Sequence, residues 1–193
     1  MTWYDTVKIN IYVYVAIKVK CMLKIIHSMK HLRFSELMHV YHETNICNGK
    51  EFYPHLTEFE QIRNAEDDFY QYLQSVFFKQ DDSYYAVWEE EGCYLSALRI
   101  EPYSDGLLLC GLETIPSARH RGYASALILA VQTYLQQQGS GRIYSHISKR
   151  NLPSLAVHKK CGFQIIKDHA VYSDGSVAYN SYTMLYEYEK SET

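Results

Sequence analysis

A nearly unbroken apolar run, followed by a basic loop and an amphipathic segment, constrains the fold more than any other part of this chain. Residues 106–115 read Gly-Leu-Leu-Leu-Cys-Gly-Leu-Glu-Thr-Ile, which is typical of a central strand buried on both faces. Pro116 ends that strand, because proline cannot donate to a strand ladder. Apolar residues then recur at positions 124, 127, 128, 131 and 135, which is helical spacing. The segment predicts a buried strand joined by a short loop to a helix.

The loop itself, Arg-His-Arg-Gly-Tyr-Ala at residues 119–124, has the properties of a phosphate-binding site. The first-turn amides of a helix have no internal partners, and the helix dipole adds partial positive charge there. Gly122 lets the backbone approach a ligand closely, and Arg119 and Arg121 add charge. The loop is neither a Walker loop nor a Gly-x-Gly-x-x-Gly fingerprint.

Two segments resemble those of the GCN5-related N-acetyltransferases. Residues 119–124 fit Arg/Gln-x-x-Gly-x-Gly/Ala, the acyl-CoA pyrophosphate loop of that family. Residues 151–163, which begin at Asn151 and end in Gly162 and Phe163, are similar to its Asn-x-x-(Ala/Ser)-x-x-x-Tyr-x-Lys-x-Gly-Phe segment. The two occur in the family's order, with a strand-like stretch at 142–148 between them. The resemblance is tightest over residues 106–168.

The resemblance implies a mixed α/β fold, with a twisted, mostly antiparallel sheet of six to seven strands flanked by four helices. The fourth and fifth strands of such a sheet splay into a V that holds pantetheine, and Gly111 fits the bulge of the fourth strand. We expect a β-prone amino-terminal extension over residues 1–21 and a single acetyltransferase domain over residues 22–193.

Helix signals in the first half of the chain complete this expectation. Ser35 can cap a first helix, and Thr57 with Glu60 forms a capping box that opens a second helix. Phe59 belongs to the expected apolar face of that second helix. Residues 43–56 contain asparagine, glycine and proline and predict a loop, which in the family lines the acceptor pocket.

The resemblance also implies that acetyl-CoA is the cosubstrate. Its pantetheine would lie along residues 112–115, where one free amide would polarise the thioester carbonyl. Asn151 would bind pantetheine and Lys160 the phosphates, although helix capping and surface coverage would explain these two residues as well. The expected cosubstrate-binding residues are Leu112, Thr114, Ile115, Arg119, His120, Arg121, Gly122, Tyr123, Ala124, Ser125, Asn151, Ser154 and Lys160.

Acyl transfer to an amine needs a base for the amine proton and benefits from an acid at the departing thiolate. His146 stands where bacterial ribosomal-protein alanine acetyltransferases carry a glutamate base, and Glu113 is the rival base because burial would raise its pKa. His158 replaces the family tyrosine that faces the CoA sulfur, so the resemblance makes it the candidate acid. Each of the three also has a structural alternative. His146 would then only fill one face of its strand, Glu113 would only accept hydrogen bonds, and His158 would be an ordinary surface residue of a helix.

From this resemblance we expect an acetyl-CoA-dependent N-acetyltransferase acting on a primary amine of a small molecule or on a peptide or protein amino group. Transfer would be direct, with Cys161 packed as an apolar residue rather than acylated. The 19 tyrosines fit either a β-rich fold or a pocket for a cationic or aromatic amine. The alternative functions are a non-catalytic acyl-CoA sensor and an interaction module of the same fold.

Composition argues against several other functions. The formal net charge of −3 leaves no basic surplus to neutralise nucleic acid. Residues 8–26 are too short and too interrupted by lysine to span a membrane. His39 and His42 have no third ligand in view, so no metal is expected. The 5 dispersed cysteines predict reduced thiols and a cytoplasmic protein. The resemblance implies acetyl-CoA and an amine acceptor as partners, and a homodimer is a possible assembly.

Overall fold

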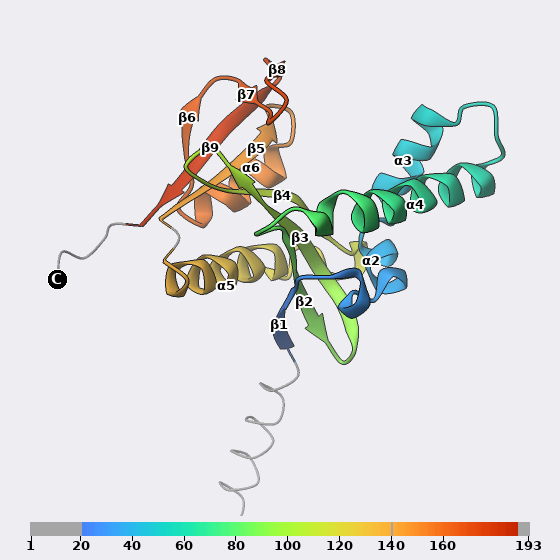
Figure 1. The fold of residues 1–193 in the computed structure, drawn as a ribbon, viewed down its shortest axis with the longest axis horizontal. Helices are drawn as coiled ribbons and strands as arrows, with labels where there is room; N and C mark the ends of the chain where they lie inside the picture. The colour runs from blue at the N-terminus through green and yellow to red at the C-terminus, as the bar shows by residue number, and fades with distance from the viewer. Residues whose placement is uncertain (1–20, 140, 189–193) are drawn as a thin grey trace, which may run out of the picture.

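A sheet with the strand order β1-β2-β3-β4-β5-β9-β6 forms the centre of the structure (Figure 1). This computed structural model describes residues 21–139 and 141–188. The strands of the sheet are β1 (Cys21–Ile26), β2 (Tyr84–Glu90), β3 (Cys93–Tyr103), β4 (Gly106–Thr114), β5 (Arg142–Ser148), β6 (Gln164–Lys167) and β9 (Ser181–Glu187). Neighbouring strands run antiparallel except β4 and β5, which are parallel. The predicted mixed, mostly antiparallel sheet is confirmed.

Shorter elements and the helices surround this sheet. The helices are α2 (Phe34–Val40), α3 (His42–Phe52), α4 (Glu58–Ser75), α5 (Tyr123–Gln137) and α6 (Leu152–Lys160), with 3-10 turns η1 (Met29–His31), η2 (Phe77–Lys79) and η3 (Pro116–Ala118). Strands β7 (Ala170–Val171) and β8 (Val177–Ala178) form a separate antiparallel pair. None of the helices within the described ranges is long and apolar enough to cross a membrane. The predicted extension over residues 1–21 lies outside the described residues, apart from Cys21, which begins β1.

The helix α3 corrects the prediction of a loop over residues 43–56. Gly49 is buried in α3, and a Cβ atom at this position would lie 2.6 Å from the carbonyl oxygen of Gln61 in α4. Glycine therefore serves here to bring two helices together, and not to make a turn. In Figure 1, α3 and α4 lie side by side and project from the rest of the molecule. The residues that the structure describes therefore contain five α-helices, one more than the four that were expected.

The capping signals are confirmed for two helices and wrong for one. The hydroxyl oxygen of Thr57 accepts from the backbone N–H of Glu60, whose carboxylate accepts from the N–H of Thr57, so the predicted capping box opens α4. Asn151 caps α6 by accepting from the N–H of Ser154 at 3.1 Å. Ser35 lies inside α2 and is not its cap. Phe59 is 74% exposed, because the first turn of α4 extends beyond the sheet.

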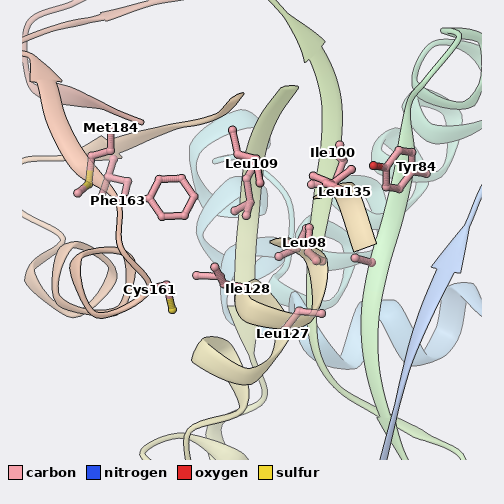
Figure 2. Close-up of a cluster of buried hydrophobic side chains, with 14 of the residues drawn as sticks. Tyr84, Leu98, Ile100, Leu109, Leu127, Ile128, Leu135, Cys161, Phe163 and Met184 are labelled. Atoms are coloured by element: carbon pink, nitrogen blue, oxygen red, sulfur yellow. The ribbon is translucent and has the colours of Figure 1, made fainter. Parts of the chain in front are cut away.

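The sheet buries an apolar core on each of its faces. Figure 2 shows the core that contains Leu98 and Ile100 from β3, Leu109 from β4, Leu127, Ile128 and Leu135 from α5, and Cys161, Phe163 and Met184 from the carboxy-terminal part. The opposite core contains Tyr85, Val87 and Ala97 with Leu37 and Val40 of α2 and Leu73 of α4. Strands β2 and β3 are thus covered on both faces, which holds the start of the next strand, β4, in a fixed position.

The strands β4 and β5 separate soon after they begin. They pair only at Leu107 with Ile143 and at Leu108 with Tyr144. Strand β5 instead pairs with β9 along its whole length. On its other side β4 carries a bulge, since the register with β3 shifts between Ala97 and Arg99, opposite Gly111 and Leu112. Gly111 has a φ of +62°, a conformation that favours glycine. The predicted splay and the bulge at Gly111 are confirmed.

Candidate active site

A cavity of about 790 Å³ lies where the end of β4 meets the start of α5 and one side of α6. Its lining residues are Thr44, Leu112, Glu113, Thr114, Ala118, Arg119, His120, Gly122, Tyr123, Ala124, Ser125, Asn151, Pro153, Ser154, Ala156, Val157 and Lys160. Every predicted cosubstrate-binding residue is among them except Ile115 and Arg121. Ile115 does not line the cavity, and its N–H, which was expected to face pantetheine, donates to the carbonyl oxygen of Leu95 at 3.0 Å.

The start of α5 has an open, uncapped geometry that suits an anion. Gly122 is the residue that precedes the helix, and its φ of +87° belongs to the left-handed region. No side chain of a described residue caps this end of the helix, and the first turn contains no acidic residue. A Cβ at Gly122 would meet no atom within 4 Å, so the space in front of the amides is free. These residues fit the phosphates of a CoA-type ligand.

The three basic side chains of the loop take different positions. Arg119 is engaged away from the amides: its Nε donates to the carbonyl oxygen of Thr114 at 3.1 Å, and its Nη2 to Oε2 of Glu43 at 2.6 Å. It therefore ties the loop to the end of β4 and to α3. Arg121 is exposed with its guanidinium 5.2 Å from the ring centre of Tyr123, and His120 is exposed and lines the cavity.

A smaller cavity of about 170 Å³ occupies the gap between β4 and β5. It is lined by residues 109–112 of β4, residues 145–148 of β5, and Asn151, Ser154 and His158. Leu112, Asn151 and Ser154 line both cavities, so the two meet at the splay. The candidate base His146 and the candidate acid His158 line the small cavity, whereas Glu113 lines the large one.

The Glu113 carboxylate is half-buried, and burial and three neighbouring side chains shift its pKa. Burial raises the pKa of Glu113, the hydrogen bond from the Thr44 hydroxyl and the charge of Arg119 lower it, and the charge of Glu43 raises it. The net direction is upward from the ordinary value of a glutamate. A carboxylate whose pKa is raised toward neutrality is a better proton acceptor, as a general base requires.

His146 lies between two tyrosines and has no hydrogen-bond partner in the described part of the chain. Its ring meets Tyr103 and Tyr172 edge to face, with ring centres 5.0 and 5.4 Å apart. Both ring nitrogens are buried and unpaired. Burial, followed by the charge of Lys167, lowers the pKa of His146. The imidazole is thus neutral near pH 7, and one nitrogen can accept a proton or a hydrogen bond.

His158 is 1% exposed, which argues against the alternative of a surface histidine. Its Nδ1 lies 2.8 Å from the carbonyl oxygen of Ser154 and its Nε2 lies 3.2 Å from Oγ of Ser145. Because a carbonyl oxygen can only accept, Nδ1 carries a proton. The Ser145 hydroxyl also reaches the carbonyl oxygen of Leu109 at 3.0 Å, across the gap. Burial lowers the pKa of His158, and the hydrogen bond to Ser154 partly offsets this effect.

Sequence reasoning gave no role to three residues near the site: two lie in α3, which was predicted as a loop, and the third, Tyr41, lies between α2 and α3. Thr44 donates to Glu113, Glu43 pairs with Arg119, and Tyr41 donates to the bulge carbonyl of Gly111 at 2.5 Å. The absence of proline from residues 42–52 was the signal that could have indicated a helix there. Among residues 21–139 and 141–188, no cluster of three or more His, Cys, Asp or Glu side chains could hold a metal ion.

The chain belongs to the acetyltransferase (GNAT) family, whose family model matches residues 39–163. Its fold is similar to that of the PaiA N-acetyltransferase from Thermoplasma acidophilum in complex with coenzyme A, with a TM-score of 0.57 and 14% identity over 86% of this chain and 99% of that chain. It is also similar to the ribosomal-protein-S18-alanine N-acetyltransferase from Escherichia coli, with a TM-score of 0.53 and 13% identity over 89% of this chain and 99% of that chain.

A curated relative matches a shorter part of the sequence. The mycothiol acetyltransferase of Saccharomonospora viridis is 33% identical over 61 residues, which are 32% of this chain. The match spans 20% of the length of that relative. The family match places the chain in the GNAT family, and the structural similarities show its fold.

Proposed function

We propose that this protein is an acetyl-CoA-dependent N-acetyltransferase that transfers the acetyl group directly to a primary amine. The observation that carries the proposal is the large cavity, because it joins the uncapped start of α5 to the carboxylate of Glu113 in one continuous space. A site that holds phosphates at one end and a proton acceptor at the other meets both needs of acyl transfer from a CoA thioester.

The cosubstrate would be held by backbone groups more than by side-chain charge. The amides after Gly122 would bind the pyrophosphate, with Arg121 and Lys160 close enough to add positive charge and His120 beside them at the cavity wall. The pantetheine chain would follow residues 112–114 into the gap, opposite Asn151. Acetyl-CoA supplies the acetyl group as an activated thioester. The bulge at Gly111 leaves the amide of Leu112 as the candidate donor to the thioester oxygen.

For the base, we favour Glu113 over His146. The raised pKa of Glu113 and its place in the large cavity allow its carboxylate to take a proton from the ammonium group of the acceptor. The free amine can then attack the thioester carbonyl. His146 lines the other side of the splay and is the second candidate, directly or through a water molecule.

For the departing thiolate, we favour His158 as the proton source. Its lowered pKa makes its imidazolium a stronger acid than an ordinary histidine, so proton transfer to a thiolate with an ordinary pKa near ~8.5 is downhill. Because Nδ1 already donates to Ser154 and the lowered pKa keeps the imidazole neutral, Nε2 would first take up the proton that the acceptor nitrogen loses as it is acylated. That proton would reach the sulfur through the hydroxyl of Ser145, which gives its own proton to the sulfur as it receives one from His158.

Calorimetric titration with acetyl-CoA, followed by thiol release against a panel of amines with mass detection of the products, tests this function. Gly122→Glu should abolish acetyl-CoA binding by placing bulk and negative charge in front of the amides. Gly92→Glu is the matched control, since Gly92 has the same φ of +87° and equally open surroundings in the β2–β3 turn.

The outcomes separate the functions that were considered. Binding with release from one amine class supports the proposal. Binding without release from any amine supports the acyl-CoA sensor instead. Absence of acetyl-CoA binding by the unmodified protein, or equal affinity in Gly122→Glu and Gly92→Glu, contradicts the assignment of the cavity.

A further inference from the structure

A largely buried arginine that the proposed chemistry does not use lies beside the bulge of β4. Arg99 is a β3 residue, and its side chain is 22% exposed. Three aromatic rings surround its guanidinium: the centres of Phe69, Tyr72 and Phe77 lie 5.9, 5.5 and 6.0 Å from Cζ. These distances are at the outer limit of a cation–π contact, so the rings enclose the charge without pairing it.

The hydrogen-bonding capacity of this guanidinium is not used by oxygen acceptors. A guanidinium carries five N–H donors. Within the described residues, the carboxylate that pairs with it is Glu101, and the distance of 3.7 Å between Nε and Oε1 is too long for a hydrogen bond. The neighbouring Cys110 thiol cannot neutralise the charge, because burial raises the pKa of Cys110 to about 12. Glu101 thus balances the charge without filling the N–H donors, and a guanidinium whose donors are unfilled can bind a further carboxylate.

The guanidinium is also close to the place where the acetyl group would be transferred. A Cβ on Gly111 would lie 3.4 Å from Nε and 3.8 Å from Nη2 of Arg99. Gly111 is exposed and lines the cavity in the gap, and Glu113 follows two residues later on the same strand. Since residue 111 is a glycine, it places no side chain of its own between the cavity and the guanidinium, and the Tyr41 hydroxyl lies beside Arg99 at the same distance of 3.4 Å from that Cβ position. Arg99 itself is not among the residues that line either cavity, so a ligand would reach it past Gly111.

We infer that Arg99 binds a carboxylate of the acceptor, and that the acceptor is therefore an amino acid or a similar small molecule with a carboxylate a few bonds from its amine. This inference rests on the proposed function. A planar guanidinium matches a carboxylate through two parallel hydrogen bonds, which would fix the amine relative to Glu113. A polyamine without a carboxylate would instead bring a second positive charge to Arg99 and be disfavoured.

A matched set of acceptors tests the inference on the intact protein. Phenylalanine, phenylalaninamide and phenethylamine share one side chain and differ at the carboxylate; the equivalent leucine and lysine sets cover other side-chain types. With the unmodified protein, kcat/KM should be roughly 10- to 100-fold higher for the carboxylate-bearing member of the preferred set. Arg99→Met should bring that ratio close to one and leave the affinity for acetyl-CoA unchanged. Arg99→Lys should keep only part of the preference.

Arg33→Met is the control, because Arg33 also lies over a ring, that of Tyr94 at 4.6 Å, but is exposed and is not among the residues that line either cavity. It should keep the full preference. If the unmodified protein acetylates the decarboxylated amine as fast as the amino acid, the inference is overturned while the N-acetyltransferase function stands.

A second measurement covers the case in which no amine in the set is acetylated. Titration of the CoA-loaded protein with N-acetylphenylalanine and with its amide then reports carboxylate binding without chemistry. Binding of the acid alone, lost in Arg99→Met, supports the inference even if the proposed transferase function fails. Equal binding of acid and amide, or no binding of either, overturns it.

Discussion

The strongest test of the proposed base concerns the hydroxyl of Thr44, because this group donates directly to the Glu113 carboxylate. Thr44→Val removes the donor and keeps the shape of the side chain. The hydrogen bond stabilises the charged form of Glu113 and so lowers its pKa, against burial, which raises it. Without the bond, the pKa of Glu113 should rise further.

The size and sign of the effect follow from the structure. A hydrogen bond to a charged group contributes about 1.5–3 kcal/mol, and 1.36 kcal/mol corresponds to about one pKa unit. Because the carboxylate is only half-buried, we take the lower end, about one unit. A base must be deprotonated to act, so activity falls as the pH drops through its pKa. The acid limb of the kcat/KM profile should therefore move to higher pH in Thr44→Val, by about one unit.

Glu43→Gln should move the same limb in the opposite direction. The charge of Glu43 raises the pKa of Glu113, and its carboxylate also holds Arg119, whose charge lowers that pKa. Removing the charge of Glu43 takes away its raising effect, and Arg119 keeps its place near Glu113 through its hydrogen bond to the carbonyl oxygen of Thr114. The assay is thiol release at saturating acetyl-CoA with a varied amine, so that kcat/KM for the amine is followed over about pH 5.5–9.5.

Thr133→Val is the matched control for this experiment, because Thr133 is an exposed threonine of α5 that donates to the carbonyl oxygen of Leu129 away from the site. Its profile should coincide with that of the unmodified protein. If neither Thr44→Val nor Glu43→Gln shifts the acid limb, and His146→Phe abolishes it, Glu113 is not the base and His146 takes its place.

Three further substitutions test the parts of the site that surround the base. His158→Phe should slow turnover with little change in acetyl-CoA affinity, and unchanged turnover would remove the assigned acid. Tyr41→Phe deletes the donor to the bulge carbonyl of Gly111 and should lower kcat about tenfold at constant acetyl-CoA affinity. An unaltered kcat would mean that the bulge keeps its conformation without this hydrogen bond. Gly49→Ala places a methyl group 2.6 Å from the Gln61 carbonyl oxygen. It should reduce the free energy of unfolding by about 1–3 kcal/mol, as measured in a denaturant titration. Helix propensity alone would give a gain in stability, and such a gain would refute the close packing of α3 on α4.

The part of the fold that could be predicted from the sequence is the part that local signals determine. The apolar run of β4 and the helical spacing of α5 are each visible within a few residues, and so are the capping box at Thr57 and the cap at Asn151. Their structures depend on hydrogen bonds and side chains close by in the chain. For the same reason the cavity could be assembled in advance from the residues of two motifs.

The part that could not be predicted depends on contacts between distant segments. The helix α3 has weak periodicity and is held by packing on α4 through Gly49, which a sequence scan interprets as a turn residue. The contact of Thr44 with Glu113 joins residues 69 apart in sequence, and that of Glu43 with Arg119 joins residues 76 apart. The aromatic rings around Arg99 likewise come from α4 and η2, so the sequence near residue 99 does not predict these contacts.

The brief pairing of β4 with β5 also affects how the protein unfolds. With only two paired positions at this junction, the sheet consists of two hydrogen-bonded plates, β1 to β4 and β5 with β9 and β6, joined mainly through the apolar core under α5. A ligand in the gap would contact both plates at once and act as a missing strand between them. By mass action, occupancy at a hundredfold excess over Kd would add about 2.7 kcal/mol to the free energy of unfolding. The amides of β4 and β5 at the junction would then exchange with solvent more slowly, so that the resistance of the molecule to heat and proteolysis would follow the concentration of its own cosubstrate.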